Sequence, residues 1–276
     1  MKRPSSVGVA SGPATQGQRR SAWWLIAGLL VLAFNLRLIF PSLAVLLPQI
    51  TRAAGLSSAA AGYLTTLPVV CMGVFAPLAP LCARRVGLER TLLAVVALLA
   101  CGTALRGLAG VGGLFIGTAV AGAAIAVANV LLPALVKRDF PAHVATMTAM
   151  YIVAMYVGAS LVAAGTVPLL QRWHAHWPTG LALCALPAAI ATLLWLPKLW
   201  RQGPSTVRAL PRVRGLARDP LAWQVTFFMG LQSAMAYIAA GWVAPILQSR
   251  GLSPTQAGWI TSVVMFATIA GGLSAP

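Results

Sequence analysis

Long apolar stretches alternate with short polar segments over nearly the whole chain. About eight such stretches, each of 18 to 28 residues, can be traced. A helix of this length crosses the roughly 30 Å hydrocarbon layer of a bilayer. We therefore predict membrane helices near residues 22–49, 57–82, 90–109, 111–136, 143–169, 178–199, 221–248 and 255–276.

Two segments lack this pattern. Residues 1–21 are rich in Ser, Gly, Pro and Arg and lack the apolar core of a signal peptide, so we predict a disordered cytoplasmic tail. Residues 200–220 contain five Arg, three Pro and no long apolar run. We predict that they form a cytoplasmic linker.

The composition excludes a water-soluble fold. Apolar residues make up 59% of the chain and charged residues 8%, whereas soluble domains carry about 25% charged residues. The formal net charge of +17 would suit nucleic-acid binding, but the basic residues recur in alternate segments between the predicted helices. They are Lys2, Arg3, Arg19, Arg20, Arg84, Arg85, Arg90, Lys137, Arg138, Lys198, Arg201, Arg208, Arg212, Arg214 and Arg218.

Only Arg52, Arg106, Arg172 and Arg250 are predicted near the opposite helix ends. This asymmetry is typical of an even number of crossings with a cytoplasmic N-terminus. We therefore predict a multi-pass protein of the cell inner membrane that contacts the lipid bilayer and binds no nucleic acid.

An internal repeat relates the first two predicted helices to the last two. Gly55-Leu56-Ser57 recurs 196 residues later as Gly251-Leu252-Ser253. An offset of six helices preserves orientation, as in transporters built from two parallel six-helix halves. We predict a first half at 22–199 and the start of a second half at 221–276. A matching second half would need four more helices, about 120 residues, so the sequence looks like a truncated two-half protein.

Four segments carry a family resemblance. They are Asn35-Leu36-Arg37, the stretch from Ala79-Pro80 to Arg90, the stretch from Asn129 to Pro141, and Phe228-Met229-Gly230-Leu231-Gln232-Ser233. Together they resemble the cyanate and nitroimidazole transporter family of the major facilitator superfamily. The resemblance implies an all-α membrane protein with the fold of that superfamily, with about eight of an expected twelve helices.

The superfamily's gating motif, G-x-x-x-D-R-x-G-R-R, is degenerate after the second predicted helix. The chain keeps Arg85 and Gly87 but has Pro80 and Arg84 where the motif has Gly and Asp. The resemblance implies that Arg84, Arg85, Gly87 and Arg90 form the gating loop. Gly87 permits the tight turn that a short loop needs.

Arg37 is the most informative single residue. A charge near the middle of a membrane helix costs at least about 2.5 to 3.5 kcal/mol, so it should face a cavity or a partner. The three acidic residues of the chain, Glu89, Asp139 and Asp219, all fall in predicted cytoplasmic loops. A small anionic substrate is therefore the leading candidate partner, because guanidinium offers a bidentate fork to planar anions. The alternative is that Arg37 snorkels or is satisfied by backbone groups of neighbouring helices.

Pro41 and Asn35 define the surroundings of Arg37. Pro41 has no N–H to pair with the Arg37 carbonyl, which predicts a bend in the helix at this point. Asn35 lies about 200° around the helix from Arg37 and should not share its face. Asn35 either bonds a neighbouring helix or lines the cavity.

Other polar residues within the predicted helices are candidates for the substrate-binding site. Asn129, Gln232 and Tyr237 are expected to join Arg37 and Asn35 there. Tyr151 and Tyr156 could hydrogen-bond substrate or simply pack, and we include Tyr151 in the predicted site. Gly113, Gly117 and Ala121 form a small-residue stripe that predicts close helix packing.

These patterns predict a secondary active or facilitated transporter of a small anionic or polar solute, working by alternating access. We expect a monomer without cofactor or metal. No triad, paired carboxylate or phosphate-binding loop suggests an enzyme. The alternative is a truncated, transport-inactive membrane protein or scaffold.

Overall fold

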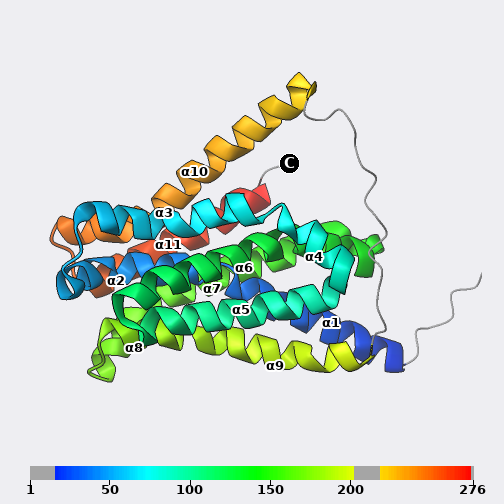
Figure 1. Ribbon diagram of the computed structural model, residues 1–276, viewed down its shortest axis with the longest axis horizontal. Coiled ribbons are helices and arrows are strands. Elements are labelled where there is room, and N and C mark those ends of the chain that lie inside the picture. Colours follow the sequence, from blue (N-terminus) through cyan, green and yellow to red (C-terminus); the bar gives the residue numbers. More distant parts are fainter. Residues whose placement is uncertain (1–15, 202–217, 275–276) are drawn as a thin grey trace, which may run out of the picture.

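The computed structural model describes residues 16–201 and 218–274, with side chains described over 23–196 and 218–267. Helices and short connections account for these ranges (Figure 1). The elements are α1 (Gln16–Asn35), α2 (Ile39–Ala54), α3 (Ser58–Phe75), α4 (Leu78–Val86), α5 (Leu88–Leu108), α6 (Gly110–Asp139), the 3-10 turn η1 (Pro141–His143), α7 (Val144–Arg172), α8 (Trp177–Leu183), α9 (Ala185–Arg201), α10 (Pro220–Ser249) and α11 (Pro254–Ser274).

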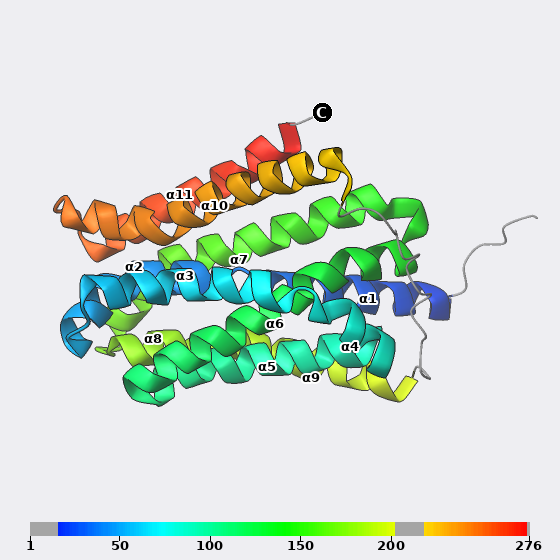
Figure 2. The same ribbon diagram turned by 45° about the horizontal axis from the view of Figure 1, so that its top comes forward.

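The eight predicted segments correspond to these helices in order, which confirms the all-α prediction. The first, second and sixth segments are each divided into two consecutive helices. Seven segments of the described chain are long and apolar enough to cross a membrane, and α11 supplies the eighth predicted segment. The helices run roughly along a common direction (Figure 2).

The first segment breaks at residues 36–38, between α1 and α2. Here the Leu36 N–H donates to the Ala33 carbonyl at 3.0 Å, a tight turn instead of a regular helical hydrogen bond. Pro41 follows four residues after Arg37, and its ring would clash with the Arg37 carbonyl of a continuous helix. The predicted bend is confirmed.

The two copies of the repeat adopt the same local structure. Gly55 and Gly251 both have positive φ, of 62° and 92°, and end α2 and α10. The next residue donates its N–H to the carbonyl five positions back, Leu56 to Thr51 at 3.1 Å and Leu252 to Leu247 at 3.2 Å. This is the hydrogen bond of a Schellman cap. We call the end of the bundle that holds both turns the Gly55 end.

The opposite end holds the connection between α4 and α5, which is Gly87 alone. Gly87 has φ 93° and ψ 156°, a conformation that L side chains rarely adopt. The predicted gating loop is therefore mostly helical: Arg84 and Arg85 lie in the last turn of α4 and Arg90 in the first turn of α5. We call this the Gly87 end, and the starts of α1 and α10 point toward it (Figure 1).

The predicted start of the first helix needs correction, and parts of the predicted tail and linker lie outside the described residues. The first helix begins at Gln16 and not at residue 22, because Gln18, Arg19 and Arg20 are good helix formers even beyond the apolar stretch. Residues 1–15 of the predicted tail, and residues 202–217 of the predicted linker, lie outside the described part of the chain.

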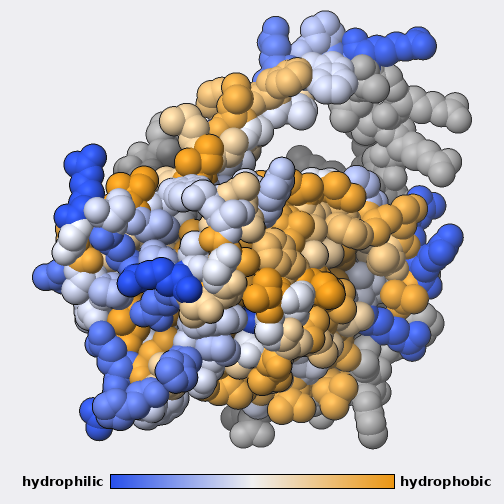
Figure 3. Space-filling view, turned by 60° about the vertical axis from the view of Figure 1, so that its left-hand side comes forward, coloured by the Kyte–Doolittle hydropathy of each residue, from blue (hydrophilic) through white to orange (hydrophobic). Residues whose placement is uncertain are grey.

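The helices pack closely through small residues. A Cβ on Gly117 of α6 would lie 2.4 Å from the Gly102 carbonyl oxygen of α5, which confirms the packing role predicted for the small-residue stripe. Trp195 of α9 is 1% exposed and donates its Nε1–H to the Gly28 carbonyl of α1 at 2.9 Å. Large apolar side chains remain exposed on the flank of the bundle, with hydrophilic residues to either side (Figure 3).

Replacement of Gly122 by alanine tests the close packing of α3 and α6. The added methyl group would lie 2.8 Å from Pro68 Cα, so we expect a loss of about 1–3 kcal/mol in the free energy of unfolding from overpacking. Thermal unfolding in detergent measures the effect. Gly112→Ala on the same helix is the control, because no atom lies within 4 Å of the added Cβ. Equal unfolding midpoints for the two variants would contradict the packing.

Candidate functional site

Arg37 lies where α2, α7 and α10 meet. Its Cζ is 4.7 Å from the ring centroid of Tyr156 on α7 and 5.5 Å from that of Tyr237 on α10. The ring centroids of Tyr237 and Phe40 are 4.8 Å apart. The half-buried guanidinium is therefore held by cation–π contacts with tyrosines from two helices far apart in sequence. We call Arg37, Tyr156 and Tyr237 the arginine cage.

Among the described residues, no carboxylate forms an ion pair with Arg37. The three acids of the chain lie at helix ends: Glu89 in the first turn of α5, Asp139 at the last position of α6, and Asp219 as the N-cap of α10. In the described residues, the ion pairs of Glu89 and Asp139 are with Arg138. Arg37 is a half-buried cation in a membrane segment without an opposite charge.

A small cavity adjoins the arginine cage. It has a volume of about 250 Å³ and lies between α2, α3 and α10. Phe40, Tyr237 and Trp242 give it aromatic walls, while Thr65 and Thr66 contribute hydroxyl groups. Both threonine hydroxyls donate to the Gly62 carbonyl at 2.9 Å, so their oxygens remain available only as acceptors.

Near the Gly55 end, α10 packs against α2. Ala244 of α10 is fully buried, and Gln248 Nε2 donates to the Val45 carbonyl of α2 at 3.1 Å. Earlier in α10, Phe227, Phe228 and Leu231 are all exposed, and the helix diverges from the bundle in Figure 1. Helix α10 therefore covers the rest of the bundle less closely at the Gly87 end than at the Gly55 end.

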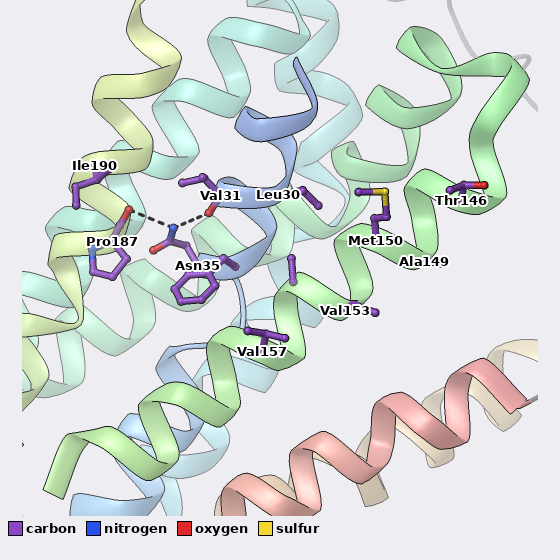
Figure 4. A pocket seen from close by; sticks show the side chains of 12 residues that line it. Leu30, Val31, Asn35, Thr146, Ala149, Met150, Val153, Val157, Pro187 and Ile190 are labelled. Atoms are coloured by element: carbon purple, nitrogen blue, oxygen red, sulfur yellow. Dashed lines mark hydrogen bonds between the residues drawn. The ribbon is translucent and has the colours of Figure 1, made fainter. Parts of the chain in front are cut away.

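Asn35 faces away from the arginine cage, as its helical offset from Arg37 predicted. Its Nδ2 donates to the Val31 carbonyl at 2.7 Å and to the Pro187 carbonyl of α9 at 3.2 Å (Figure 4). It lines an apolar groove of about 740 Å³ between α1, α7 and α9, together with Met150, Val153 and Ile190. Asn35 thus ties α1 to α9.

The other predicted binding residues are dispersed. Asn129 is half-buried on α6 and does not line the cavity beside Tyr237. Tyr151 packs against the main apolar core, and Gln232 is exposed on α10. Of the six residues predicted for substrate binding, Arg37 and Tyr237 are the two that the structure brings into contact.

Two residues of this region were not assigned to the site from the sequence. Tyr156 was considered as a hydrogen-bonding residue but was not included in the predicted site. Gly158, two residues later, could have indicated close helix packing here, because a Cβ on it would lie 2.5 Å from the Phe34 carbonyl oxygen. That glycine marks the crossing of α7 over α1. Arg106, which was expected near a membrane surface, is 0% exposed. It is covered because Gly107 and Gly117 let α8 and α6 approach α5 closely.

At the Gly87 end, Glu89 belongs to α5 and not to a loop, and it is 6% exposed. Its Oε1 lies 2.5 Å from Arg138 Nη2, and Arg138 Nε lies 2.6 Å from Asp139 Oδ1. The basic residues Arg84, Arg85 and Arg90 around this ion-pair cluster are exposed. The cluster joins the start of α5 to the end of α6.

The chain is similar in sequence to several membrane transporters. The sequence pattern of the Major Facilitator Superfamily matches residues 23–276. Over 91% of this chain, the 2-nitroimidazole transporter of Escherichia coli is 44% identical, and the match covers 64% of that relative. An uncharacterized transporter of Bacillus subtilis is 34% identical over 93% of this chain and 64% of its own length. The cyanate transport protein of Escherichia coli is 27% identical over 90% of this chain and 65% of its own length.

The fold also has a counterpart among solved structures. The crystal structure of a D-xylose–proton symporter superposes with a TM-score of 0.61 at 16% identity, covering 91% of this chain and 66% of that one. This likeness shows a common fold. The chain spans slightly less than two thirds of the length of these relatives, 64% for the first two.

Replacement of Glu89 by alanine tests the ion-pair cluster. Because Arg138 is partly exposed and keeps Asp139 as a partner, we expect a loss of about 1 kcal/mol in the free energy of unfolding, near the upper range for exposed pairs. Thermal unfolding in detergent checks this, with Arg90→Ala, an exposed charge on the next residue, as the control. A midpoint for Glu89→Ala no lower than that of the control would refute the contribution of the pair.

Proposed function

The chain belongs to the Major Facilitator Superfamily, and from this premise we propose that it serves in transmembrane transport of a small anionic or polar solute, similar to cyanate or a nitroimidazole. The observation that carries the proposal is the arginine cage: a guanidinium within a membrane segment, held by two tyrosines and lacking a carboxylate. An uncompensated charge of this kind marks a functional site by default.

The chemistry of the cage favours a planar anion. Stacking engages the face of a guanidinium, whereas bidentate hydrogen bonds to an anion use its N–H edge. Tyr156 and Tyr237 can therefore orient Arg37 without consuming all of its donors. The adjoining cavity of about 250 Å³ is smaller than the roughly 300–1,000 Å³ of sites for drug-sized ligands, which favours a solute of a few heavy atoms.

The proposed transport cycle is alternating access between two parallel halves. We assign residues 22–199 to the first half, 200–220 to a cytoplasmic linker and 221–276 to the start of the second half. The similar turns at Gly55 and Gly251 support this division. The contacts of α10 at the Gly55 end, and its exposure toward the Gly87 end, support a state open to the Gly87 side.

The same proposal places the Gly87 end in the cytoplasm of a cell inner membrane, with a cytoplasmic N-terminus and a monomeric protein. The basic residues Arg84, Arg85 and Arg90 at that end support this orientation. Because the acids and the three His of the sequence fall near helix ends or in connections, a proton that crosses with the solute would travel on the solute itself. We assign the gating role to the break at Gly87 and the arginines around it.

Arg37→Ala is the direct test of the site. Loss of the guanidinium should weaken binding of cyanate or 2-nitroimidazole at least about tenfold, the effect of one lost charge-assisted hydrogen bond. Uptake of both labelled compounds into proteoliposomes, and their equilibrium binding, are measured beside the thermal unfolding midpoint. Arg52→Ala is the control, because Arg52 is exposed and, in the described part of the chain, its hydrogen bond is to the Pro48 carbonyl of its own helix. If the Arg37→Ala protein is folded and keeps full binding and uptake, the proposal is wrong.

The same measurements separate the alternative, a transport-inactive membrane protein or scaffold. That alternative is favoured by the exposed apolar first part of α10. Binding that depends on Arg37, without uptake, would identify a protein that retains the site but does not transport. Absence of binding to the wild-type chain would reject the proposed solute class.

Substitutions of Tyr156 separate ring stacking from hydroxyl bonding. Tyr156→Phe keeps the ring over Arg37 and should bind both compounds as the wild type does. Tyr156→Leu removes a contact worth about 0.5–2 kcal/mol and should weaken binding by about 2- to 30-fold. Equilibrium binding in detergent measures both variants. If Tyr156→Phe were as weak as Tyr156→Leu, the hydroxyl and not the ring would be the functional group.

A further inference from the structure

Arg106 is a second arginine within a membrane segment, and it is fully buried. Its Nη1 donates to Ser42 Oγ and its Nη2 to the Ile39 carbonyl, both at 3.4 Å. Its Nε has no hydrogen-bond partner among the described residues. Glu89, the acid on the same helix, is 17 residues away, about 25 Å along the axis. Among the described residues, the hydrogen-bond partners of the buried Arg106 guanidinium are therefore a hydroxyl and a carbonyl.

Both partners of Arg106 belong to the first turn of α2. Ile39 is the first residue of α2 and lies two positions after Arg37. The Ser42 hydroxyl also donates to the Ile39 carbonyl at 3.0 Å, so Arg106, Ser42 and Ile39 form a closed set of hydrogen bonds. This set fixes the start of α2 on the side where the helix has lost its regular hydrogen bonds at the break.

Glycines hold Arg106 in this position. A Cβ on Gly117 would lie 2.8 Å from the Arg106 backbone nitrogen and 2.9 Å from its Cγ. A Cβ on Gly107 would lie 2.2 Å from the Pro178 carbonyl oxygen. Because α6 and α8 contact α5 through these glycines, the Arg106 side chain is surrounded and directed at α2.

From this arrangement we propose that Arg106 is a positioning residue for Arg37: it clamps the first turn of α2 so that the turn at residues 36–38 presents Arg37 between Tyr156 and Tyr237. The functional part of this inference rests on the proposed binding role of Arg37. The clamp itself does not, since it concerns the free protein. Arg106 touches the backbone of α2 and not the solute.

Amide hydrogen exchange tests the clamp without any ligand. In Arg106→Met, the amides of Ile39, Phe40, Ser42 and Leu43 should exchange at least about tenfold faster than in the wild type, as expected for local opening. Arg106→Lys, which keeps one donor group, should fall between them. Gly117→Ala should also speed exchange there, whereas Gly112→Ala, whose added Cβ meets nothing within 4 Å, should not. Unchanged exchange at 39–43 in Arg106→Met would overturn the clamp.

Binding of cyanate and 2-nitroimidazole tests the consequence for Arg37. Arg106→Met should raise the dissociation constant at least about tenfold. The variant should stay folded, with a proteoliposome kcat within about twofold of the wild type, and Arg106→Lys should show partial rescue. Faster exchange at 39–43 with an unchanged dissociation constant would overturn the positioning of Arg37. Wild-type binding that is insensitive to Arg37→Ala would instead reject the proposed function, and the exchange result would still decide whether Arg106 clamps α2.

Discussion

Pro41 has no backbone N–H, and its ring occupies the space where the Arg37 carbonyl of a regular helix would lie. The chain forms a tight turn at residues 36–38, and this turn divides the first apolar segment into α1 and α2. Arg37 emerges from that turn toward α7 and α10, while Asn35, just before it, bonds α9. The position of the cage, the bond between α1 and α9, and the polar contacts of Arg106 all depend on this one break.

The break also concentrates charge. Arg37 and Arg106 approach it from opposite sides, one stacked on aromatic rings and the other bonded to a hydroxyl and a carbonyl. Neither contact neutralises a cation as a carboxylate would, and burying an unpaired charge is costly. Two of the chain's three acids, Glu89 and Asp139, instead surround Arg138 at the Gly87 end, where they join α5 to α6. The interior around the break is therefore electropositive.

The sequence predicted those features that depend on local chain chemistry. Apolar length located the eight segments, Pro41 located the break, and Gly55 and Gly251 located matching turns because these features follow from a few neighbouring residues. The contacts of Tyr156 and the burial of Arg106 and Glu89 could not be predicted in the same way. A membrane helix is apolar on all sides, so its periodicity does not reveal which face meets which neighbour. That information lies in tertiary packing, such as the close approach of α7 to α1 at Gly158.

The arginine cage brings together α7 and α10, which each contact Arg37 through a tyrosine ring. Tyr156 comes from α7 and Tyr237 from α10, so both rings surround Arg37 only while α10 keeps its present position relative to α7. Losing one ring would cost about 0.5–2 kcal/mol, which shifts the ratio of two conformational populations by about 2- to 30-fold. An anion bound at the free N–H edge of Arg37, while both rings hold its face, would favour this arrangement of α7 and α10. Solute occupancy and the conformational equilibrium would then be thermodynamically linked through a single side chain.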